Sequence, residues 1–244
     1  MKLWQKLMLS ALVVASGGYF WFLLGGAYPP TLGLISSLSA VVLVFFLGML
    51  GLAFILLEKN ISALLVLLSA SPTLLFLGDK YLALGIMLGS ATLSFVPAHR
   101  IKKEIKSRMI FSVGEMLHKG MPVFLTIMAL SLAAFFYPQL GAITFQDVIP
   151  ESFFEKVLAF LPFEVPEDAL YQTSIDLLQE RFRSYERYLP VVFVFVVFAA
   201  FRTLFILLGW IGIAISWLAF KILLYASVVK ISTRPMPQEY IEFK

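Results

Sequence analysis

Long runs of apolar residues, separated by short polar breaks, constrain the fold of this chain more than any other feature. Five such segments lie in the N-terminal part of the chain and cover residues 7–27, 31–57, 61–77, 81–97 and 121–138. Only 14% of all residues are charged, whereas soluble domains have about 25%. A helix of about 20 apolar residues spans the hydrocarbon core of a bilayer and satisfies its own backbone there. The sequence therefore predicts an all-α, polytopic integral membrane protein.

One further apolar block, at residues 188–229, is about twice as long as the others. As a single helix it would measure about 63 Å, or twice the thickness of the hydrocarbon core. We therefore predict two helices in this block, with Gly209 and Gly212 as the turn residues, and about seven transmembrane helices in total. The third segment contains Pro72 and is expected to kink. If the third and fourth segments form a re-entrant pair instead, the count and the side of the C-terminal tail change.

The distribution of charge predicts the orientation. The stretch from His99 to Gly120 carries six Lys and Arg residues against two Glu, whereas residues 138–187 carry nine acidic residues against four basic ones. Basic loops remain on the cytoplasmic side. Because four helices precede the first stretch and five precede the second, both agree with this rule. We expect a bacterial or archaeal cytoplasmic membrane, with residues 139–187 outside.

The N-terminus resembles a signal peptide, because Lys2 and Lys6 precede an apolar run. That run continues beyond the small residues at Ser16, so we expect an uncleaved first helix, with cleavage after Ser16 as the alternative. These boundaries divide the chain into a five-helix membrane domain (1–138) that includes a basic amphipathic segment (99–118), a helical hairpin (139–187), two transmembrane helices (188–229) and a polar tail (230–244).

The polar region between the fifth and sixth helices has the pattern of a helical hairpin. Ser152 and Glu155 have the spacing of a capping box, and Pro166 suits the first turn of a second arm. Apolar residues recur along this arm at intervals of four and three, which forms a heptad seam. The candidate partner-binding residues on the seam are Tyr171, Ile175, Leu178, Phe182 and Tyr185. The seam either packs on the shorter arm or binds another protein or another copy of the chain.

The basic segment at 99–118 has apolar residues every three or four positions, with most cations off that face. A basic amphipathic helix of this kind binds anionic lipid headgroups, whereas a solvated linker is the alternative. The candidate headgroup contacts are Arg100, Lys102, Lys103, Lys106 and Arg108. We expect no nucleic-acid partner, because no recognised binding module accompanies these charges.

Small residues at a spacing of four allow membrane helices to approach closely. Gly85 and Gly89 have this spacing in the fourth segment. They serve either packing within the chain or oligomerisation.

Few ionisable residues occur at membrane depth, where they would indicate transport or catalysis. Arg202 and Lys221 lie in the last apolar block and are the candidate polar path. Arg202 is near a predicted helix end, where its side chain can reach the interface. Lys221 either lines a polar cavity or indicates that the helix boundary differs from the predicted one.

The sequence offers weak support for catalysis. It has no Cys and two His, so no metal or other cofactor is expected. Asp79 lacks a second intramembrane aspartate, and Ser90 has no His at matching depth to act as its base. We therefore predict a non-catalytic subunit, scaffold or assembly factor of a membrane complex. A channel or transporter is the alternative, and a hydrolase that uses Asp79 or Ser90 is a third hypothesis.

Overall fold

The computed structural model describes residues 3–26, 37–107, 111–140, 188–229 and 231, together with Thr173, Ser174, Leu177, Glu180 and Arg181. The elements with defined bounds are α1 (Leu3–Gly26), α2 (Ser37–Leu56), α3 (Lys59–Ser69), α4 (Thr73–Phe76), α5 (Lys80–Leu93), α6 (Phe95–Ser107), α7 (Val113–Leu140) and α11 (Leu189–Tyr225). The predicted all-α fold class is confirmed for these described residues.

Six helical stretches within the described residues are long and apolar enough to cross a membrane. They are Leu3–Gly25, Ser37–Leu56, Lys59–Phe76, Lys80–Ser107, Val113–Pro138 and Leu189–Tyr225. This result supports a multi-pass integral membrane protein. It contains one candidate span fewer than the seven predicted, and the difference arises in the last apolar block.

The block at residues 188–229 forms one helix, α11, rather than the two predicted helices. Gly209 and Gly212, the expected turn residues, are buried inside α11. A Cβ atom at Gly209 would overlap Leu125 of α7, and one at Gly212 would lie 3.0 Å from Cβ of Leu47 in α2. The two glycines therefore permit close helix packing and do not form a turn. A helix of about 55 Å exceeds the hydrocarbon thickness, so α11 must tilt or extend beyond it.

The basic segment at 99–118 is divided between two helices and is not one separate amphipathic helix. Its first part is the end of α6, and its last part is the first turns of α7. The apolar face of α6 packs on α7, where a Cβ atom at Gly120 would lie 2.5 Å from Ile101 and 2.8 Å from the carbonyl oxygen of Pro97. Ile101 is fully buried as a result. The apolar periodicity thus reflects helix packing within the bundle.

The predicted kink in the third segment is confirmed. Helix α3 ends at Ser69, and the short helix α4 begins directly after Pro72. Two hydroxyl groups compensate locally for the interrupted backbone hydrogen bonds. Ser71 donates to the carbonyl oxygen of Leu68 at 2.8 Å, and Thr73 donates to that of Ala70 at 2.8 Å.

Helix α2 lies inside the bundle and packs against α1, α6 and α11. Its side chains Phe46 and Phe54 are buried and meet Phe124 of α7 edge to face, with centroid distances of 6.4 and 5.7 Å. In contrast, α11 exposes large apolar side chains along most of its length, among them Phe195 and Trp210. Such a surface suits contact with lipid.

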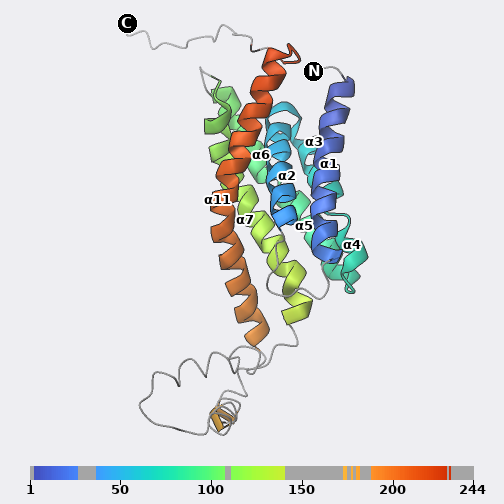
Figure 1. Cartoon of the computed structure of the whole chain (residues 1–244), viewed down its shortest axis with the longest axis vertical. Helices are drawn as coiled ribbons and strands as arrows, with labels where there is room; N and C mark the ends of the chain where they lie inside the picture. The colour runs from blue at the N-terminus through green and yellow to red at the C-terminus, as the bar shows by residue number, and fades with distance from the viewer. Residues whose placement is uncertain are drawn as a thin grey trace, which may run out of the picture.

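The ends of the helices fall into two groups (Figure 1). The start of α1, the end of α6, the start of α7 and the end of α11 lie at one end of the bundle, which we call the basic end. The end of α7 and the start of α11 lie at the opposite end, and these two helices run side by side in opposite directions. An even number of spans is consistent with this grouping.

Candidate anion-binding site

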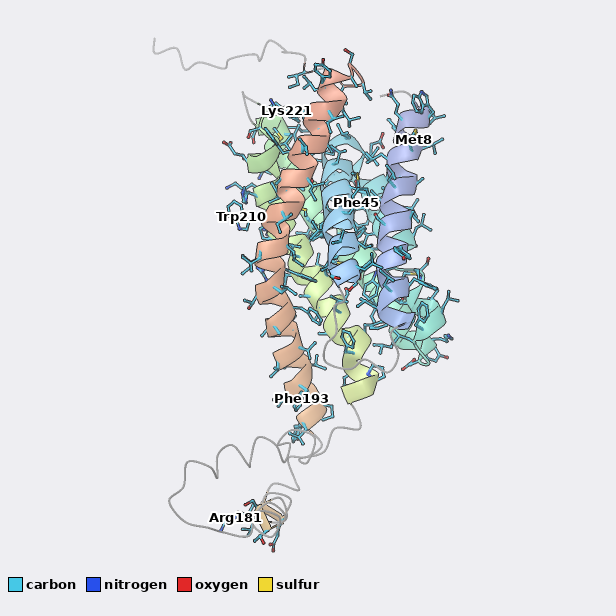
Figure 2. The ribbon with its side chains drawn as sticks, viewed as in Figure 1. Met8, Phe45, Arg181, Phe193, Trp210 and Lys221 are labelled. Atoms are coloured by element: carbon cyan, nitrogen blue, oxygen red, sulfur yellow. The ribbon has the colours of Figure 1, made fainter. Side chains whose placement is uncertain are left out.

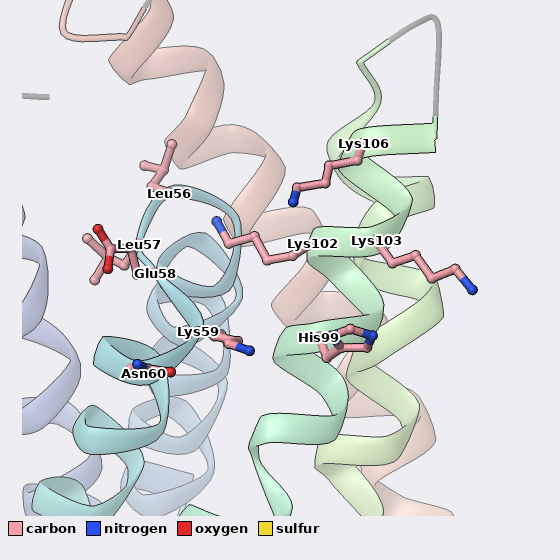
Figure 3. Close-up of a pocket in the computed structure, with 9 residues that line it drawn as sticks. All are labelled: Leu56, Leu57, Glu58, Lys59, Asn60, His99, Lys102, Lys103 and Lys106. Atoms are coloured by element: carbon pink, nitrogen blue, oxygen red, sulfur yellow. The ribbon is translucent and has the colours of Figure 1, made fainter.

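A cavity of about 770 Å³ lies at the basic end, between α6 and the turn that joins α2 to α3 (Figure 3). It is lined by Leu56, Leu57, Glu58, Lys59, Asn60, His99, Lys102, Lys103 and Lys106. Four lysines against a single glutamate make the cavity strongly cationic. Its lining comes from two segments that are about 40 positions apart in the sequence.

The short turn between α2 and α3 is held in place by Lys102. Its Nζ atom donates a hydrogen bond of 2.7 Å to the carbonyl oxygen of Ile55, in the last turn of α2. The last carbonyl groups of a helix have no partner within the helix, and a cation there also interacts favourably with the helix dipole. Lys102 therefore fixes the wall of the cavity.

The start of α3 contributes a second favourable feature for an anion. Glu58 is the N-cap residue, yet its side chain does not cap the helix. The first N–H groups of α3 therefore lack a capping side chain next to the cavity. Helix N-termini carry a partial positive charge and attract anions, and the nearby ammonium groups add to this effect.

The lysine side chains differ in direction (Figure 3). Lys102 and Lys106 lie one turn apart on α6 and point toward the α2–α3 turn, while Lys59 points from α3 toward α6. Lys103 points away from this turn. Three ammonium groups from two helices thus face the same cavity, and ammonium groups are suited to binding the oxygen atoms of a phosphate group.

Three of the five predicted headgroup contacts, Lys102, Lys103 and Lys106, line this cavity. Arg100 is exposed and is not part of the lining, and Arg108 lies outside the described residues. Sequence reasoning missed Lys59, because it belongs to a different polar break. The available signal was that both breaks fall on the same side of the predicted topology.

The candidate partner-binding residues Tyr171, Ile175, Leu178, Phe182 and Tyr185 lie outside the described residues. Five other residues of this stretch are described (Thr173, Ser174, Leu177, Glu180 and Arg181), and all five have helical backbone. The hairpin and its seam therefore remain a prediction.

The two residues of the candidate polar path are not brought together. Arg202 and Lys221 are 19 residues apart on α11, or about 28 Å along the helix axis. Lys221 is exposed one turn before the end of α11, near the basic end (Figure 2), and its Nζ atom lies 5.6 Å from the ring centroid of Trp217. This position agrees with the interpretation that the helix boundary differs from the predicted one.

The two residues considered for hydrolysis have structural contacts. Asp79 is the N-cap of α5 and accepts hydrogen bonds from the backbone N–H groups of Tyr81 at 2.9 Å and Leu82 at 3.2 Å. The Oγ atoms of Ser90 and Ser131, on α5 and α7, lie 2.8 Å apart and are buried. Among the described residues, no three His, Cys, Asp or Glu side chains are grouped so that they could hold a metal ion.

Comparison of the chain with known protein families, curated proteins and solved structures gave no match.

Proposed function

We propose that this protein is a non-catalytic, membrane-embedded subunit, scaffold or assembly factor that presents residues 139–187 on the extracytoplasmic side of a membrane. One observation carries this proposal. The helices that flank this segment, α7 and α11, pack along each other and have their segment-bearing ends at the end of the bundle opposite the cationic cavity.

The two flanking helices pack closely against each other. The rings of Phe136 and Phe201 stack with a centroid distance of 6.0 Å, and Phe136 lies about one turn before the end of α7. Deeper in the bundle, Gly209 allows α11 to approach Leu125. Aromatic pairs and close small-residue contacts are the interactions that stabilise helix association in membranes.

The orientation follows from the charges of the two ends. Residues at the basic end include Lys59, Lys102 and Lys106, which line the cavity, and Lys221 near the end of α11. The positive-inside rule places such an end in the cytoplasm, which leaves residues 139–187, with their excess of acidic side chains, outside. Six spans in this orientation place the start of α1 and the end of α11 on the cytoplasmic side.

A channel or transporter built on Arg202 and Lys221 is the weaker proposal. The two side chains are about 28 Å apart on one helix and cannot coordinate one solute together. Lys221 also lies near the water-exposed end of the bundle, where a charged side chain reaches the interface at low cost.

The test introduces a charge into the predicted seam. Ile175→Asp is expected to abolish the association of the full-length protein with its partner or with another copy, because the seam would bury an unpaired carboxylate. Thr173→Asp adds the same charge on the opposite face of the same predicted helix and is the matched control. Association is measured by native gel electrophoresis of detergent-solubilised membranes. Equal migration of wild type, Ile175→Asp and Thr173→Asp would contradict the proposal.

A further inference from the structure

We propose that the cationic cavity between α6 and the α2–α3 turn is a specific site for the headgroup of an anionic phospholipid from the surrounding leaflet. This inference concerns the opposite end of the molecule from the proposed partner surface, and it does not depend on that function. Basic pockets between membrane helices on the cytoplasmic side commonly bind phosphate-containing headgroups.

The geometry of the lysines favours one localised anion over a diffuse ion atmosphere. Lys102 is held by the carbonyl oxygen of Ile55 at 2.7 Å, so its position is fixed before any ligand binds. Lys106 and Lys59 point into the same space from two different helices. A preorganised group and two adjustable ones can enclose the oxygen atoms of one phosphate.

The surface below the cavity indicates that the ligand is a lipid. On α3, Leu64 and Leu68 follow Asn60 at intervals of four residues, so they share its face and lie progressively deeper in the bundle. On α6, Phe95 and Val96 lie one turn deeper than His99. All four side chains are exposed.

Since α3 and α6 pack on each other, these apolar faces continue from the cavity toward the membrane centre. They offer acyl chains a surface directly beneath the headgroup. Free inorganic phosphate would use the lysines alone and would leave these faces without a role.

The test uses native mass spectrometry of the delipidated full-length protein, titrated with phosphatidylglycerol, phosphatidylcholine or inorganic phosphate. The cavity variant is Lys59→Gln with Lys106→Gln. The matched control is Lys119→Gln with Lys221→Gln, which removes the same charge from two exposed lysines outside the cavity. We expect one phosphatidylglycerol to bind more tightly than phosphatidylcholine, with an affinity about 30-fold lower in the cavity variant and nearly unchanged in the control.

Three outcomes would overturn the proposal. An equal loss in both variants would indicate general electrostatic attraction, and equal binding of the two lipids would remove headgroup selectivity. Displacement of phosphatidylglycerol by inorganic phosphate at similar concentration would identify free phosphate as the ligand. Lys59→Arg with Lys106→Arg is expected to retain binding, which separates loss of charge from loss of folding. If the glutamine pair does not fold, the lipid preference of the wild-type protein and its response to inorganic phosphate decide the question.

Discussion

Small residues occur in two regions of the molecule, at the contact between α2 and α11 and on the outer face of α5. Only in the first region do they bring two helices close together. At the contact, a Cβ atom at Gly48 would overlap Ile215, and one at Gly51 would lie 2.5 Å from the Oγ atom of Ser216. On α5, Gly85 and Gly89 have the spacing of a close-packing motif, yet a Cβ atom at either would meet nothing within 4 Å. Small-residue spacing thus indicates that close approach is feasible, but the partner helix decides whether it occurs.

A hydrogen bond between the two helices also stabilises the α2–α11 contact. The hydroxyl of Ser216 donates to the carbonyl oxygen of Gly48 at 2.7 Å and to that of Gly212 at 3.0 Å. The glycine at 48 brings the two backbones close enough for this bond. Packing and hydrogen bonding therefore depend on each other at this position.

The largest expected effect comes from filling this contact. Gly48→Leu forces α2 and α11 apart and is expected to lower the free energy of unfolding by about 3 kcal/mol. Gly89→Leu adds the same side chain where nothing lies nearby. Unfolding of the purified protein is measured by titration with a denaturing detergent. If both variants lose the same stability, the distinction between the two regions is wrong.

The second-largest loss of stability is expected at one of two neighbouring lysines, Lys102 and Lys103. Lys102 donates to Ile55, whereas Lys103 is exposed and points away from the α2–α3 turn. Lys102→Met leaves a carbonyl group of α2 without its charged partner and is expected to lower the free energy of unfolding by about 1.5 kcal/mol. Lys103→Met is the control, with an expected change below about 0.5 kcal/mol. The same unfolding titration checks both, and equal losses would show that Lys102 does not hold the turn.

A smaller effect is expected on the inner face of α5. Ser90 contacts Ser131 of α7, and each hydroxyl also has a carbonyl acceptor in its own helix, Ile86 and Ile127 respectively. Two hydroxyl protons thus serve three contacts. A double-mutant cycle with Ser90→Ala and Ser131→Ala is expected to give a coupling energy of about 0.6 kcal/mol. A coupling energy of zero would mean that the hydroxyl pair does not contribute to the α5–α7 contact.

The smallest effect is expected at the open glycines. Gly85→Ala and Gly89→Ala place a methyl group in free space, so neither is expected to lower the free energy of unfolding, and the higher helix propensity of alanine raises it by about 0.5 kcal/mol. The measurement is the same detergent titration, performed at low protein concentration. A loss of more than about 1 kcal/mol in either variant would show that this face of α5 is packed.

Much of the fold could be predicted from the sequence, because a membrane requires helices of a fixed length. The positions of the first five spans and the kink at Pro72 follow from apolar segment length and from the missing N–H group of proline. The block at 188–229 was misjudged because its length permits two helices, and its glycines suit a turn as well as a helix contact. Only the presence of Leu47 and Leu125 opposite those glycines distinguishes the two.

The candidate site was predictable in part for a similar reason. Lys102, Lys103 and Lys106 belong to one basic stretch and were found by charge and periodicity. Lys59 contributes from another segment. Lys102 is half-buried and the adjacent Lys103 is exposed because of where the α2–α3 turn lies. Periodicity identifies a face of a helix, but it does not identify what that face meets.

The number of spans is the central claim, and the absence of cysteine from the chain allows a direct test. Three single variants, Ser112→Cys, Leu177→Cys and Ser227→Cys, are treated in intact cells with a membrane-impermeant maleimide. Six spans predict that Leu177→Cys is labelled in intact cells, whereas Ser112→Cys and Ser227→Cys are labelled only after the cells are opened. Labelling of Ser227→Cys in intact cells would mean that the chain crosses the membrane twice after residue 188, which would contradict the single helix α11 and the account built on it.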